Sequence, residues 1–143
     1  RIEADLFLPV SYGDTRYISF LKKHAQYNYG RLEFVDRYMP FDEYLKFINT
    51  SDGLIMNTIR PQGYGNILMM MYLNKPVFFN KKNISLPDLD AAELKWRSLE
   101  SFRDYKREEP ALLNKDAVIR LLSHDRLLKE YKHLFSGCSA SRL

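Results

Sequence analysis

The chain is poor in the residues that build covalent or metal-bound frameworks. Its 143 residues include a single cysteine, Cys138, which excludes an internal disulfide framework and a cysteine-rich metal site and fits a reducing cytoplasm. No apolar run approaches the roughly 20 residues that a membrane-spanning helix needs, and no signal peptide precedes the first apolar segment. The three histidines lack partners at metal-ligand spacing. We therefore predict neither a metal nor a cofactor.

The composition is that of a soluble globular protein with an ordinary core. Hydrophobic residues make up 45% and charged residues 28% of the chain, and the net charge is +4. This mild excess of positive charge suits anionic small molecules, anionic lipid surfaces or nucleic acid. Nucleic acid ranks last, because acidic residues are interspersed and no helix is rich in arginine. A peripheral contact with the inner face of a membrane, through Arg126, Lys129 and Lys132, is a minor alternative to a solvated surface.

Apolar segments with alternating strand and helix character predict an α/β fold. The segment at 77–79 is apolar throughout and does not alternate apolar with polar residues. Strands without such alternation favour a Rossmann-like parallel sheet with helices on both faces, joined by right-handed crossovers. We expect one domain over residues 1–136, with a long closing helix at about 115–135 and a flexible tail at 137–143. Residues 96–102 fit either a strand or a packed loop. The predicted strands are 4–10, 32–36, 53–58 and 77–79, and the predicted helices between and after them are 15–29, 40–49, 66–73 and 87–94.

The most informative segment is Arg60-Pro61-Gln62-Gly63-Tyr64-Gly65-Asn66, between a predicted strand and a predicted helix. Glycines at such a junction let the backbone approach a ligand closely. The first helical turn then offers unpaired N–H groups and the positive end of the helix dipole. The segment therefore predicts a site for a phosphate-bearing ligand, although it matches neither standard nucleotide-binding glycine motif.

Two further loops should lie at the same carboxyl edge of the sheet, where ligands bind in open α/β folds. They are Ser11-Tyr12-Gly13 and the Arg37-to-Phe41 loop. We expect the three loops to converge in space and form one site. As an alternative, each loop could have a purely structural role, as a tight turn without ligand, a helix cap or a packed aromatic group.

Three short motifs, in order and in register, resemble one known family. The chain is similar to the 4-α-L-fucosyltransferases, the TDP-N-acetylfucosamine:lipid II N-acetylfucosaminyltransferases, over roughly residues 5–80. It departs from the family pattern at Pro61, where the family has glutamine, and at Val10, where it has leucine. The motifs here are Leu8-Pro9-Val10-Ser11-Tyr12-Gly13, Phe41-Asp42-Glu43-Tyr44-Leu45 and Arg60-Pro61-Gln62-Gly63-Tyr64-Gly65-Asn66.

This resemblance implies the C-terminal, donor-binding half of a bacterial GT-B glycosyltransferase, with the N-terminal acceptor domain absent from this chain. The chain begins at Arg1 rather than methionine, and we expect a fragment without turnover of its own. The implied reaction moves an amino-deoxy sugar of the N-acetylfucosamine type from a dTDP-sugar to a polyprenyl-diphosphate-linked glycan of the cell envelope. The alternative is a non-catalytic, flavodoxin-like module for docking or phosphate binding.

The resemblance also implies roles for particular side chains. Arg60 would stabilise the leaving diphosphate, since charge develops there, while the catalytic base stays unassigned. The base of the donor nucleotide would lie near Met39 and Phe41, and its phosphates would lie near the glycine turn. Glu43 is a possible partner for a sugar hydroxyl, although a role at the helix start is the stronger reading. The donor-binding candidates are Ser11, Tyr12, Gly13, Met39, Phe41, Arg60, Gln62, Gly63, Gly65 and Asn66.

Overall fold

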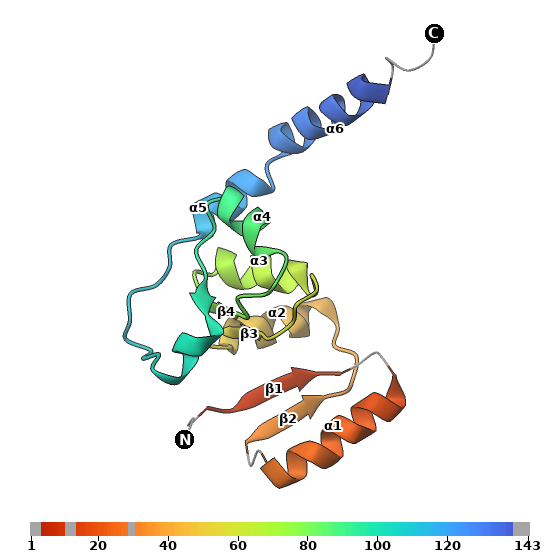
Figure 1. The fold of residues 1–143 in the computed structure, drawn as a ribbon, viewed down its shortest axis with the longest axis vertical. Helices are drawn as coiled ribbons and strands as arrows, with labels where there is room; N and C mark the ends of the chain where they lie inside the picture. Colours follow the sequence, from red (N-terminus) through yellow and green to blue (C-terminus); the bar gives the residue numbers. More distant parts are fainter. Residues whose placement is uncertain (1–3, 11–13, 29–30, 139–143) are drawn as a thin grey trace. The chain divides into compact units, whose positions relative to one another are not determined.

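The computed structural model describes residues 4–10, 14–28 and 31–138. They fall into two compact units, Arg1–Lys46 and Phe47–Leu143, and each is described here by itself. Both units contain parallel strands joined through helices (Figure 1), so the predicted α/β class with parallel strands is confirmed. The strands form two small sheets, one in each unit, rather than a single run of neighbours.

The first unit is a β-α-β arrangement. Strands β1 (Leu6–Pro9) and β2 (Leu32–Val35) pair in parallel, with helix α1 (Thr15–Asn28) between them in sequence. Pro9 ends β1, as expected for a residue without an N–H group. The carboxylate of Asp14 caps α1, since it accepts hydrogen bonds from the N–H groups of Arg16 and Tyr17, at 2.8 and 3.2 Å.

The second unit holds a three-stranded parallel sheet. Its order is β3 (Leu54–Met56), β4 (Val77–Phe79) and β5 (Arg97–Ser98), so β4 is the central strand. All three residues of β4 are at most 1% exposed, as the absence of alternation in this segment predicts. Helix α3 (Tyr64–Tyr72) connects β3 to β4 and buries one side in the same core. Its buried residues are Ile67, Leu68, Met70 and Met71.

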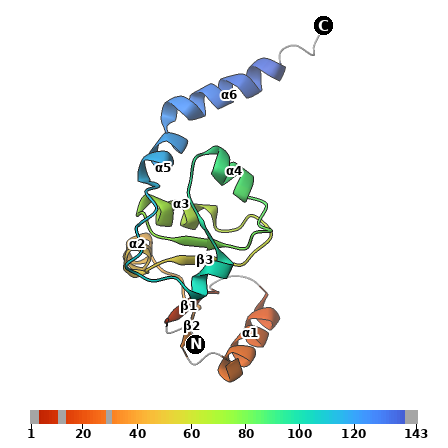
Figure 2. The same ribbon diagram turned by 60° about the vertical axis from the view of Figure 1, so that its left-hand side comes forward.

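The remaining helices before residue 104 are short. Helix α2 (Phe41–Thr50) spans the division between the units, and α4 (Leu86–Ala91) follows β4. The segment whose structure the sequence left open contains β5 and then the 3₁₀ helix η1 (Leu99–Arg103). Figure 2 shows the second unit from another side. Along the described part of the chain, no helix is both long and apolar enough to cross a membrane.

The long closing helix expected at about 115–135 is in fact two helices. Helix α5 (Lys115–Leu121) ends, and α6 (His124–Cys138) starts after a break at Ser123. The Ser123 hydroxyl accepts a hydrogen bond from the N–H of Arg126 at 3.4 Å, and its carbonyl accepts one from Leu127 at 3.1 Å. Serine is a favoured residue at a helix start, and this local capping is the reason that the apolar spacing alone misjudged the segment.

Candidate functional site

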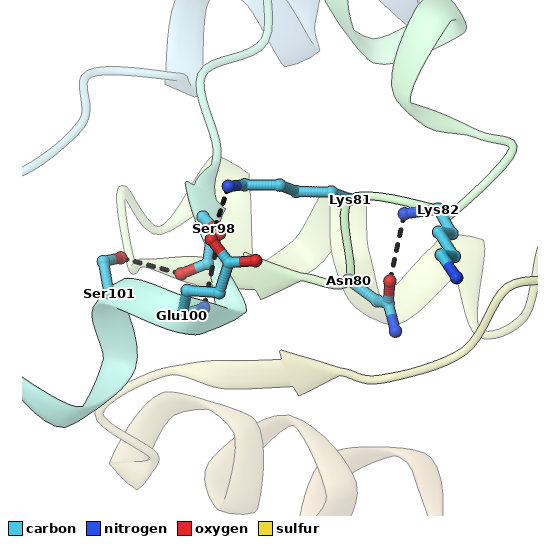
Figure 3. A network of polar contacts seen from close by, with 6 residues as sticks. All are labelled: Asn80, Lys81, Lys82, Ser98, Glu100 and Ser101. Carbon is cyan, nitrogen blue, oxygen red and sulfur yellow. Dashed lines mark hydrogen bonds and ion pairs between the residues drawn. The ribbon is translucent and has the colours of Figure 1, made fainter.

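The carboxyl ends of the three strands in the second unit form an edge rich in polar side chains, part of which is drawn in Figure 3. Asn57 and Thr58 follow β3, residues 80–83 follow β4, and Ser98 ends β5. In open α/β sheets, ligands bind beyond this edge, because the loops there are free to vary while the sheet fixes their positions. The candidate site is therefore built on this edge.

The glycine turn leads from β3 into α3. Gly63 occupies the cap position with a φ of 60°, a left-handed conformation that glycine adopts without strain. Its carbonyl accepts the first hydrogen bond of the helix, from the Ile67 N–H at 3.0 Å. No side chain caps this end. In the described part of the chain, the N–H groups of Tyr64, Gly65 and Asn66 have no hydrogen-bond partner, so they are available to an anion.

Open space lies above this first turn. A Cβ atom added at Gly65 would meet no atom within 4 Å, so packing does not require glycine there. Arg60 and Gln62 are exposed in the preceding loop, and Asn66 is half-buried. The predicted residues of the second unit are therefore together on one exposed turn, with an arginine, an amide and free backbone donors.

Tyr64, between the two glycines, keeps its proton at neutral pH. Burial raises the pKa of the Tyr64 phenol, the charge of Asp88 raises it further, and Arg126 opposes both. A protonated phenol donates a hydrogen bond. Tyr64 is 39% exposed, so this donor also lies within reach of solvent at the start of α3.

The loop after β4 is fixed to the loop after β3. The side-chain amide of Asn80 donates to Asn57 Oδ1 at 3.0 Å, and its oxygen accepts from the N–H of Lys82 at 3.0 Å. Asn83 is 4% exposed, and its amide donates to the Thr58 carbonyl at 2.8 Å. These bonds leave the backbone of residues 80–83 little freedom, so the side chains it carries are presented from a defined position.

A second group of polar contacts joins β4 to β5 and η1 (Figure 3). Lys81 forms an ion pair with Glu100. The Ser98 hydroxyl accepts a hydrogen bond from the Glu100 N–H at 3.3 Å, and Ser101 donates to the Ser98 carbonyl at 2.7 Å. Sequence reasoning missed these residues. The polar run of residues 80–83, directly after a fully apolar strand, could have indicated a site there. Strand β5 has only two residues, which is too short to give a sequence pattern that points to Glu100.

The remaining predicted site residues belong to the first unit. Ser11, Tyr12 and Gly13 lie outside the described residues. Met39 is half-buried, and Phe41, the first residue of α2, is 67% exposed. These positions belong to the first unit and the glycine turn to the second. The convergence of the three loops, and the packing of a base near Met39 and Phe41, therefore stay predictions.

Glu43 is engaged within its own unit. Its carboxylate receives two hydrogen bonds from the Arg37 guanidinium, one of them at 3.1 Å. Hydrogen bonding to Arg37 lowers the pKa of Glu43 below its usual value. The pair fixes the approach to α2, where a carboxylate also interacts well with the helix dipole.

The acidic side chains of the described residues are not gathered as metal ligands are. Among the described residues, no group of three or more histidine, cysteine, aspartate or glutamate side chains could hold a metal ion. Asp88 and Asp90 are two residues apart on α4, so their side chains do not face each other. The Asp90 carboxylate also accepts a hydrogen bond from the Trp96 indole at 2.9 Å. This Asp-x-Asp pair is therefore not arranged to bridge a metal and a diphosphate.

Comparison with known families places this geometry in context. Residues 3–101 match the model of the family described as 4-alpha-L-fucosyltransferase, glycosyl transferase group 56. Comparisons with curated proteins and with solved structures give no match. The matched region includes the glycine turn and the polar residues after β4 and β5, and it covers more than half of the chain. The chain therefore belongs to the 4-alpha-L-fucosyltransferase family and is a glycosyltransferase of the fucosyltransferase type.

Proposed function

We propose that the second unit binds the nucleoside-diphosphate sugar donor of the transfer reaction. The observation that carries this proposal is the glycine turn, where a left-handed Gly63 opens α3 and leaves the N–H groups of its first turn without partners in the described chain. Open space at Gly65 gives a ligand access to those donors. Backbone donors at a helix start, together with the helix dipole, suit a diphosphate.

In this proposal each group at the turn has a chemical role. When the bond between the sugar and the diphosphate breaks, negative charge accumulates on the departing diphosphate. The first-turn N–H groups and the exposed Arg60 guanidinium would stabilise that charge. Gln62 and the Tyr64 phenol would hydrogen-bond hydroxyl groups of the sugar or the ribose. For the first-unit candidates Ser11, Tyr12, Gly13, Met39 and Phe41, donor binding stays a prediction from the family resemblance.

The family supports a more specific reading. We propose a dTDP-linked amino-deoxy sugar as donor and a polyprenyl-diphosphate-linked glycan as acceptor, with this chain as the donor-binding domain over residues 1–136. The acceptor-binding site and the catalytic base would belong to a separate domain of a GT-B enzyme. These 143 residues alone would therefore bind the donor without turnover. A lipid-linked acceptor fits action at the inner face of a membrane by a cytoplasmic protein.

Calorimetric titration of the chain with dTDP and UDP tests the proposal. Arg60→Ala should weaken binding about tenfold, the effect of one lost charge-assisted contact. Arg107→Ala is the matched control: Arg107 is also exposed, but it pairs with Asp52, before the amino end of β3. The ratio of dTDP to UDP affinity reports on base recognition. No binding of either nucleotide, or equal losses in the two variants, would contradict a donor site at the turn.

A further inference from the structure

The pair formed by Lys81 and Glu100 lies at the carboxyl edge, where the loop after β4 is hydrogen-bonded to the loop after β3. Lys81 is the second residue after β4, on a loop fixed by Asn80 and Asn83. Glu100 is held on η1 through the Ser98 hydroxyl. Both ends of the pair are therefore attached to well-anchored backbone, and Figure 3 shows the Lys81 side chain extended across the gap between them.

The pair itself is weakly held. The side chains of Lys81 and Glu100 are 60% and 73% exposed, and an ion pair this open to water contributes little to stability. Its position on anchored loops is thus not explained by a contribution to the fold. A diphosphate carries more negative charge than one carboxylate and more acceptor oxygens, so it can replace Glu100 as the partner of the ammonium group.

The neighbouring lysine adds to the positive charge at this edge. The Lys82 ammonium group has no partner among the described residues, and Figure 3 shows its side chain directed away from Lys81. Glu100 therefore balances only one of the two adjacent cations. Without Glu100, this edge would present two unpaired lysines.

We propose that Lys81 binds the donor's phosphate groups and that Glu100 is an internal competitor, which holds Lys81 in the empty site and yields it to the ligand. This inference rests on the proposed function, since it assigns a further residue to the same site. Glu100 would make binding weaker but more selective, because a single phosphate or carboxylate displaces a carboxylate less readily than a diphosphate does.

The competitor model makes opposite predictions for the two partners. Lys81→Met should weaken dTDP and pyrophosphate binding about tenfold, whereas Glu100→Gln, which keeps the shape of the side chain, should tighten both about threefold to tenfold. In the Lys81→Met background, Glu100→Gln should have no further effect, because its action passes through Lys81. Thymidine, which has no phosphate, should respond to neither change.

Two matched variants control for net charge. Lys129→Met and Glu108→Gln alter exposed residues of the same types, on α6 and in the loop before α5, and should leave affinity unchanged. Thermal unfolding of each variant confirms folding, since an exposed pair can be removed at little cost. The inference is overturned if wild type binds dTDP and Glu100→Gln binds it no more tightly. If neither wild type nor any variant binds a nucleotide or pyrophosphate, the proposed function falls with it.

Discussion

The two units have similar β-α-β sequences but very different cores. In the first unit, Ala25, at 6% exposure, is the one described hydrophobic residue that is buried, whereas Phe7, Tyr17 and Phe20 are 46–62% exposed. In the second unit, all of β4 and one side of α3 are buried. The difference lies in position within the sheet, because a central strand is covered on both faces and a strand of a two-stranded sheet is not. A buried central strand can fix the loop that follows it, and the anchored polar edge is found there.

The largest expected effect is on the core of the second unit. Phe79, at 0% exposure, packs edge-on against Trp96, with ring centroids 6.1 Å apart. Phe79→Ala should lower the free energy of unfolding by about 3–5 kcal/mol, because it removes apolar contacts and leaves a cavity. Phe20→Ala in the first unit, where the ring is 62% exposed, should change it by less than about 0.5 kcal/mol. Urea unfolding of both variants measures this, and equal losses would show that the two cores are not different in kind.

The second unit also depends on a buried polar residue. Asn114, at 1% exposure, bonds the backbone N–H and carbonyl of Lys95 with its side chain, both at 2.7 Å. Asn114→Ala leaves these groups without partners and should cost about 1–3 kcal/mol of stability. Asn49→Ala, at an exposed position, is the control and should cost little. A neutral Asn114→Ala by thermal unfolding would contradict the assignment of this contact as a structural link.

The two glycines of the turn should separate stability from binding. Gly63→Ala places a side chain at a φ of 60° and should cost about 1 kcal/mol. Gly65→Ala has no left-handed φ and no clash, so it should stabilise α3 by about 0.5 kcal/mol. The added methyl group nevertheless stands where a diphosphate would approach, so dTDP binding should weaken. Chemical denaturation and calorimetry on the same samples measure both, and unchanged affinity in Gly65→Ala would place the ligand elsewhere.

The smallest effect concerns acid stability of the first unit. The folded pKa of Glu43 lies below its ordinary value of 4.5, chiefly through its hydrogen bonds to Arg37. The stabilisation is therefore complete above pH 4.5 and is lost as pH falls through the folded pKa. Glu43→Gln should therefore reduce the fall of the thermal unfolding temperature between pH 6 and pH 3, and Glu33→Gln on β2 is the control. An unchanged fall in Glu43→Gln would contradict the role of the pair.

Periodicity and turn chemistry predicted most of the elements. The segment at 77–79 is β4 with the bounds expected, and a helix follows the glycine turn as expected, although α3 starts at Tyr64 rather than at residue 66. The break at Ser123 was missed, since one capping residue outweighed an apolar spacing that continued across it. Asn114 occupies the cap position of α5, yet its side chain bonds Lys95 instead of the helix. Such long-range partners, like the contact between Lys81 and Glu100, are decided by the fold and leave no local pattern.

The most direct test of a donor site at the carboxyl edge is residue-resolved NMR of the ¹⁵N-labelled chain titrated with dTDP. The account predicts that amide shifts concentrate at residues 60–66, 80–83 and 98–101, with the largest at the unpaired N–H groups of Gly65 and Asn66. Amides on α5 and α6 should not respond. Saturable shifts centred on other segments, or no shifts at millimolar dTDP, would contradict the account.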